Sequence, residues 1–222
     1  MRYNLGLLLP ALLALAPSVT AKKDAPLVET TEFKNELVNI LYFDDSTVAL
    51  LQELESGRIW RSEDAGKRWK QEKELNGAGI LKNPYDNKVA TVLGETKHWI
   101  TYDQGETWSS FKTELPPSPE APLSWHATDN KKIMVNEIDN CFTAPCLGRT
   151  YYTTDGFKSE LKLLIEDRRM CQWAKGSERF LMDSDKHDDR ILCITRGKYS
   201  DRTKDFRLLI SDKWVRAGNW RC

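Results

Sequence analysis

Short apolar runs separated by polar turn residues cover much of the chain. The first three read LVNILYF, TVALLQEL and RIWRS, and the turn residues DDS and ESG stand between them. Runs of this length, bounded by Asp, Ser and Gly, are typical of β-strands joined by hairpin turns. The pattern therefore predicts an all-β fold of short antiparallel strands. The expected strands lie within 37–43, 47–54, 58–62, 88–94, 98–102 and 107–113.

Two further features of the pattern support this fold class. After residue 21, no long stretch places apolar residues at the 3.6-residue period of a helix. The segment ELPPSPEAP (114–122) contains four prolines, which cannot donate hydrogen bonds within a sheet. We expect it to form a loop between two groups of strands.

One polar motif is repeated along the chain. RSEDAGKRW (61–69) aligns with ITYDQGETW (100–108), and the aspartates of the two copies lie 39 residues apart. Both copies have a hydroxyl residue, an aspartate, a glycine and a tryptophan at the same spacing. These residues are Ser62, Asp64, Gly66, Trp69, Thr101, Asp103, Gly105 and Trp108.

Two weaker copies follow. YYTTDGFKS (151–159) keeps Thr153 and Asp155, but it has Phe157 at the glycine position and no closing tryptophan. LLISDKW (208–214) keeps only the hydroxyl, the aspartate and an aromatic residue, which are Ser211, Asp212 and Trp214. A repeat of roughly 40 to 50 residues made of short strands indicates the four-stranded blades of a β-propeller. By its length, the chain holds about four blades.

The repeated motif fits a structural turn. Its aspartate can accept hydrogen bonds from backbone N–H groups of the same turn, and its glycine allows a positive φ at no steric cost. The tryptophan buries a large apolar face. This is the Asp box, which occurs at hairpin turns of propeller blades. We expect Asp64 and Asp103 to be structural, and a catalytic or calcium-binding role is the alternative.

The N-terminus resembles a secretory signal peptide. Arg2 precedes an apolar stretch from Leu5 to Ala16, and small residues at 19–21 form a cleavage site. We expect residues 1–21 to be removed and the mature domain to span 22–222. An uncleaved anchor is the alternative, although the stretch is shorter than the roughly 20 residues that span a bilayer. No later segment is apolar enough to span a membrane.

Charge and cysteine content narrow the function classes. Lys+Arg 33 balances Asp+Glu 33, so nothing in the electrostatics indicates nucleic acid as a partner. In the oxidising secretory pathway, the five cysteines are candidates for disulfides.

Three stretches together resemble the luminal domain of sortilin-type vacuolar protein sorting receptors. They are GRIWRSEDAGKRWK (57–70), ILKNPYDNKVATVLGETKHWITYDQGETWSSF (80–111), and YYTTDGFKS (151–159) followed by CQWAKG (171–176). The resemblance runs from about residue 33 to the end of the chain and is more specific than the Asp boxes alone.

The resemblance implies a partial ten-bladed propeller that binds protein cargo, such as vacuolar or lysosomal hydrolases, without catalysis. It also implies transport between the late Golgi and the endosome or vacuole. The chain holds fewer blades than that domain, so it is either a fragment or a truncated relative. We expect an incomplete ring that associates through its bare flanks, and a chain that is secreted if it is complete. A compact four-bladed propeller is the alternative.

Family resemblance and local spacing favour two disulfides among the several pairings that five cysteines allow. One joins Cys141 to Cys146, and the other joins Cys171 to Cys193 between neighbouring strands. Cys222 is then left over.

The sequence gives less support to the hypotheses of an enzyme or a metal-binding protein. A sialidase would have proline where the chain has Trp60, and nothing singles out the carboxylate pair of a glycosidase. DSDKHDD (183–189) lacks the remaining ligands of a calcium loop. A zinc site at His126, Cys141 and Cys146 conflicts with an oxidising compartment. We therefore expect no cofactor and no metal.

Overall fold

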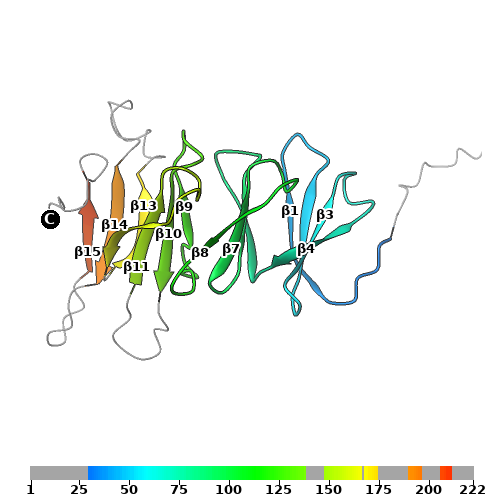
Figure 1. The fold of residues 1–222 in the computed structure, drawn as a ribbon, viewed down its shortest axis with the longest axis horizontal. Helices are drawn as coiled ribbons and strands as arrows, with labels where there is room; N and C mark the ends of the chain where they lie inside the picture. The colour runs from blue at the N-terminus through cyan, green and yellow to red at the C-terminus, as the bar shows by residue number, and fades with distance from the viewer. Residues whose placement is uncertain (1–29, 139–147, 167, 175–189, 197–205, 212–222) are drawn as a thin grey trace, which may run out of the picture. The chain divides into compact units, whose positions relative to one another are not determined.

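A computed structural model describes residues 30–138, 148–166, 168–174, 190–196 and 206–211. These residues form fifteen strands in four antiparallel sheets, and no helix occurs among them (Figure 1). All of them except Thr30 belong to one structural unit, residues 31–222. The chain is thus an all-β segment of the propeller type, as the sequence pattern predicts.

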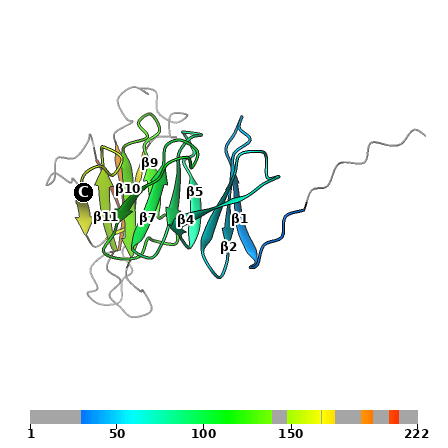
Figure 2. The same cartoon turned by 45° about the vertical axis from the view of Figure 1, so that its right-hand side comes forward.

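Each sheet is built from consecutive strands, so every connection within a sheet is a hairpin (Figures 1 and 2). Sheet A contains β1 (Leu37–Tyr42), β2 (Ala49–Glu53), β3 (Arg58–Ser62) and β4 (Lys70–Asn76). Sheet B contains β5 (Gly79–Lys82), β6 (Ala90–Leu93), β7 (Lys97–Thr101) and β8 (Ser109–Lys112). Sheet C contains β9 (Leu123–Trp125), β10 (Ile133–Ile138), β11 (Gly148–Thr153) and β12 (Lys162–Glu166). Sheet D contains β13 (Arg168–Trp173), β14 (Ile191–Arg196) and β15 (Phe206–Ile210).

All six strands expected from the apolar runs are present, as β1 to β3 and β6 to β8. The segment 114–122 forms no strand and makes one isolated bridge, between Pro117 and Glu137. The runs did not reveal β4, because its sequence KQEKELN is polar and most of its side chains are at least partly exposed. An outer strand has little apolar surface to bury, so it leaves a weak sequence signal.

The register of the sheets is the same in three of the four. Ala49 pairs with Ser62 in sheet A, and Ala90 pairs with Thr101 in sheet B. Ile133 pairs with Thr153 in sheet C. The hydroxyl residue of each Asp box therefore lies opposite the first residue of the second strand of its sheet.

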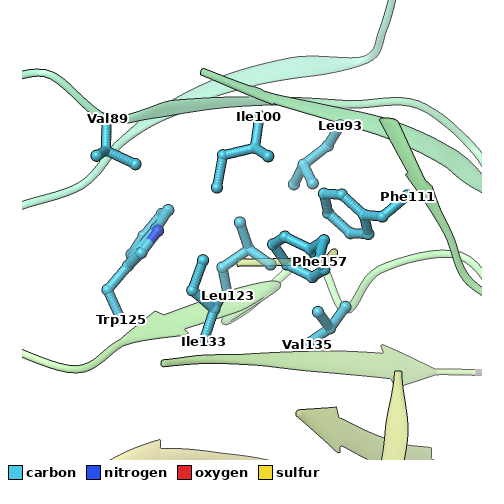
Figure 3. Packing of buried hydrophobic residues seen from close by; sticks show 9 residues of the cluster. All are labelled: Val89, Leu93, Ile100, Phe111, Leu123, Trp125, Ile133, Val135 and Phe157. Carbon is cyan, nitrogen blue, oxygen red and sulfur yellow. The ribbon is translucent and has the colours of Figure 1, made fainter. Parts of the chain in front are cut away.

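The apolar core consists of three clusters, each formed by two sheets that are consecutive in the sequence. Sheets A and B share the cluster that contains Leu50, Ile59 and Val92. Sheets B and C enclose the nine residues of Figure 3, in which Phe111 and Phe157 stack with ring centroids 3.7 Å apart. Sheets C and D share a third cluster, which consists of Met134, Cys171, Trp173, Ile191, Cys193 and Leu209. Face-to-face packing of consecutive sheets is the arrangement of propeller blades.

Candidate functional site: the repeated Asp-box turns

The three Asp-box copies occupy equivalent places in their sheets. Each one joins the third strand to the fourth, at β3–β4, β7–β8 and β11–β12. The repeat in the sequence therefore corresponds to a repeat in the structure.

The first turn is held by its own side chains. The Ser62 hydroxyl donates to Asp64 Oδ1 at 3.0 Å and accepts from the Gly66 N–H at 2.9 Å. Asp64 also accepts from the Arg68 N–H at 2.9 Å and from Arg68 Nε at 2.7 Å. The hydroxyl and the carboxylate of the motif thus form all these hydrogen bonds within seven residues of the chain.

The second turn repeats these bonds. The Thr101 hydroxyl donates to Asp103 Oδ1 at 2.7 Å and accepts from the Gly105 N–H at 2.8 Å. Asp103 accepts from the Thr107 N–H at 2.9 Å and from the Thr107 hydroxyl at 2.5 Å.

The third turn keeps the bonds although its sequence is eroded. The Thr153 hydroxyl donates to Asp155 at 2.9 Å and accepts from the Phe157 N–H at 3.1 Å. Asp155 accepts from the backbone of Lys158 and Ser159, each at 3.1 Å. The turn therefore forms although it has Phe157 at the glycine position and no closing tryptophan.

Two consecutive residues of every turn have a positive φ. These pairs, with φ in parentheses, are Ala65 (60°) and Gly66 (90°), Gln104 (61°) and Gly105 (83°), and Gly156 (71°) and Phe157 (67°). The third turn has its glycine at the first of the two positions instead of the second. The residue at the first position donates its N–H to the carbonyl of the residue two positions before the second strand of the same sheet, as in the bond from Gln104 to Lys88 at 2.9 Å.

The two tryptophans of the motif pack on the turns that they close. Trp69 and Trp108 are both half-buried, and each indole lies against the glycine of its own turn. Trp108 donates its ring N–H to the Gly105 carbonyl at 3.1 Å. Trp108 also packs against the apolar cluster shared by sheets A and B, and Trp69 contacts Phe33 edge to face with ring centroids 6.2 Å apart.

Hydrogen bonding keeps the box carboxylates ionised. The side chain and the backbone N–H of Arg68 lower the pKa of Asp64 to about 2. Donors on Ser159 and Thr153 lower the pKa of Asp155 to about 2. Burial raises the pKa of Asp103, but the bonds from Thr107 outweigh it and the pKa is lowered. An acid held in this form is poorly suited to donate a proton in catalysis near neutral pH.

The cysteines are partly described. Cys171 and Cys193 form a disulfide between paired positions of β13 and β14, and both are fully buried. Cys141, Cys146 and Cys222 lie outside the described residues, as do the expected signal peptide, Asp212, Trp214 and the segment 183–189. Ser211 is described, and its hydroxyl accepts from the Ile191 N–H at 2.8 Å.

The same residues offer neither a metal cluster nor a membrane-spanning helix. No group of three or more His, Cys, Asp or Glu side chains that could hold a metal ion occurs within the described ranges. Among those ranges there is also no helix of the length and apolar character that crossing a membrane requires.

Two buried glutamates at the same place of different sheets were missed by sequence reasoning. Glu53 ends β2, and Glu137 lies at the matching register position of β10. Burial raises the pKa of Glu53, but hydrogen bonds from Ser56, Asn35 and Trp60 outweigh it and the pKa is lowered. Burial raises the pKa of Glu137, which accepts from the Glu114 and Leu115 N–H groups at 3.2 Å. Their 84-residue separation, close to two repeats, was the available signal.

A second repeated turn was also missed. The sequence Asp-Asn-Lys occurs at 86–88 and again at 129–131, in the loops β5–β6 and β9–β10. In both copies the aspartate carbonyl accepts from the N–H three residues later, at 3.1 Å. The asparagine of each copy reaches the preceding sheet's loop, since Asn87 bonds the Asp44 backbone and Asn130 bonds the Asp86 side chain.

Comparison with known proteins agrees with this geometry. Residues 57–219 match the Sortilin-Vps10 family model, which is described as sortilin, neurotensin receptor 3. The chain belongs to the Sortilin-Vps10 family. It is 72% identical to the vacuolar protein sorting/targeting protein 10 of Leptosphaeria maculans over 217 residues. This alignment covers 97% of this chain and 15% of that protein. The protein of the same name from Blastomyces gilchristii is 40% identical over 92% of this chain and 14% of its own length.

The chain therefore spans about one seventh of the length of these Sortilin-Vps10 relatives. Among solved structures, a GH74 enzyme from Niastella koreensis matches this chain with a TM-score of 0.54 and 12% identity. The match covers 87% of this chain and 32% of the enzyme's chain. At this identity the match supports the fold and carries nothing about activity.

Proposed function

We propose that this chain is part of the luminal, cargo-binding region of a sorting receptor that directs soluble hydrolases from the late Golgi to the endosome and vacuole. The observation that carries the proposal is the 72% identity, over nearly the whole chain, to a protein named for vacuolar sorting and targeting. The chain acts as a binding scaffold in this proposal, with protein cargo as its partner.

The Asp-box geometry supports a non-catalytic role. In each described box the aspartate accepts hydrogen bonds from its own turn, so its oxygens are committed to holding the hairpin. A nucleophile or general acid needs its oxygen free to meet a substrate. We infer that the boxes fix the register of the sheets and that recognition takes place elsewhere on the blades.

A chimeric receptor tests the sorting role. In Leptosphaeria maculans, the matching stretch of the sorting protein is replaced by residues 22–222 of this chain, and the secreted fraction of a vacuolar hydrolase is measured. We expect the chimera to retain the hydrolase and a receptor lacking the stretch to secrete it. Equal secretion by both strains, at equal receptor abundance, would contradict the proposal.

Catalysis is tested separately on the purified chain. It is incubated with sialosides and with plant and fungal glucans, and a heat-inactivated sample serves as the control. We expect no difference between the two samples. Turnover above the control would favour the glycoside hydrolase alternative and remove the non-catalytic part of the proposal.

A further inference from the structure

A small polar pocket lies between the loops that precede the second strands of sheets B and C. Its volume is about 210 Å³, and its lining consists of Asn83, Tyr85, Asp86, His126, Ala127, Thr128, Asp129 and Asn130. Ligand sites for drug-sized molecules span roughly 300 to 1,000 Å³. This pocket is therefore suited to a single side chain or a comparably small group.

At the corresponding position between sheets A and B, the loop carboxylate is paired with a lysine of the chain itself. There Asn87 bonds the backbone of Asp44, and the Asp44 carboxylate is paired with Lys82 Nζ at 2.6 Å. Lys82 comes from the end of β5, so the chain supplies its own ammonium group at this junction.

The junction between sheets B and C has the carboxylates without that ammonium. By register, the residue in the place of Lys82 is Trp125, which is buried in the apolar cluster. Asn130 bonds Asp86 Oδ2 at 2.5 Å, and Asp129 lines the same pocket. Among the described residues, no ion pair engages Asp86 or Asp129.

Two further observations point to a ligand at this pocket. Asn83 is 1% exposed, and its Nδ2 has no acceptor within the described part of the chain, while its Oδ1 accepts from the Tyr85 N–H at 2.8 Å. Burial, followed by the carboxylates of Asp155, Asp129 and Asp86, raises the pKa of Tyr102 next to the junction. The site therefore offers a negative field together with one buried donor.

We propose that this pocket binds the ammonium group of a lysine side chain presented by a partner protein. Asp86 and Asp129 face the ammonium. Their Oδ1 atoms accept from the Lys88 and Lys131 N–H groups at 2.9 and 3.1 Å, and the remaining lone pairs of the two carboxylates receive the ammonium. A calcium ion fits less well, because it takes six to eight oxygen ligands, whereas this pocket has two carboxylates and a buried N–H donor. Binding of this kind does not depend on the proposed sorting function.

The first test uses the unaltered, isotope-labelled full chain. Nα-acetyl-lysine methylamide is titrated while the side-chain amide resonances of Asn83 and Asn130 are followed by NMR. The neutral isostere Nα-acetyl-norleucine methylamide serves as the matched ligand. We expect the lysine derivative to shift both amides and to bind roughly tenfold more tightly than the isostere. Equal shifts with both ligands, or none with either, overturn the proposal.

The second test places the binding at the pocket. Asp86→Asn and Asp129→Asn should each weaken lysine binding by at least about fivefold. Asp45→Asn is the control, because Asp45 lies in the loop β1–β2, outside the pocket, at a φ of 56° that asparagine tolerates. Circular dichroism confirms that each variant is folded. Unchanged binding in both pocket variants, or calcium chloride shifting the same amides at lower concentration than the lysine derivative, refutes the assignment.

Discussion

The second and third Asp-box turns have the same hydrogen bonds but different sequences. In both, a threonine hydroxyl bridges the aspartate and the N–H four residues after the threonine. The residue that donates this N–H has a positive φ in both turns. It is Gly105 in the second turn and Phe157 in the third. A left-handed φ costs roughly 1 to 2 kcal/mol for a residue with a side chain, so the difference needs an explanation.

The explanation lies in what each turn packs against. A Cβ on Gly105 would lie 3.2 Å from the Leu50 and Arg61 side chains of sheet A, so the place has little room for a side chain. Phe157 instead places its ring on Phe111 of sheet B, at an interplanar angle of 8° and with 9% exposure. Burying such a ring is worth about 1.5 to 3 kcal/mol, which offsets the backbone cost. In the second turn, a glycine allows sheet A to pack closely against the position with positive φ. In the third turn, burial of the phenylalanine ring offsets the cost of the positive φ.

The largest effect is expected from Phe157→Ala. Losing the buried ring should lower the free energy of unfolding by about 3 to 5 kcal/mol, which denaturant titration measures. Phe157→Gly removes the same ring but relieves the backbone, so it should be more stable than the alanine variant by about 1 kcal/mol. A glycine variant that is less stable than the alanine variant would show that the positive φ is not a cost here.

Asp103→Ala should come next. It leaves the Thr107 N–H and the Thr101 hydroxyl without their acceptor, at a cost of roughly 1 to 3 kcal/mol. Asp103→Asn keeps one oxygen acceptor and should cost less. Chemical denaturation of the three proteins checks the order, and an asparagine variant as unstable as the alanine variant would indicate that charge matters more than the bond.

Gly105→Ala should have a smaller effect, about 1 to 2 kcal/mol, from its φ of 83° and its close neighbours. Ala65→Gly in the first turn is the matched control of opposite sign, because Ala65 has a φ of 60°. We expect the glycine variant to match or exceed the parent in thermal unfolding. A stable Gly105→Ala protein would mean that the contact with sheet A is loose.

The smallest effect is expected from pH. The pKa of Asp155 is lowered to about 2, so its ionised form stabilises the folded state above the unfolded pKa of about 4. That contribution should decline as the pH falls from about 4 to 2. The difference in unfolding free energy between the parent and Asp155→Asn, measured across this range, should shrink toward zero. A difference that stays constant with pH would assign the stabilisation to the bond geometry and not to the charge.

Much of the third turn was already visible in the sequence, and the reason is locality. Thr153, Asp155 and the N–H groups that they bind lie within seven residues, so a short motif carries all the information for the turn. The role of Phe157 was not visible, because its partner Phe111 is 46 positions away. The same holds for the packing of Trp108 against a cluster to which sheets A and B both contribute.

By itself, the sequence determined the all-β class, the hairpins β1 to β3 and β6 to β8, and the hydroxyl–aspartate turns, since short apolar runs and turn chemistry depend on near neighbours in the chain. Only the tertiary structure decided which side chains close the junctions between sheets. Lys82 reaches Asp44 across one junction, whereas the next junction has a tryptophan at that place and a polar pocket beside it. Such contacts depend on distances between segments about 40 residues apart, and a local pattern does not fix those distances.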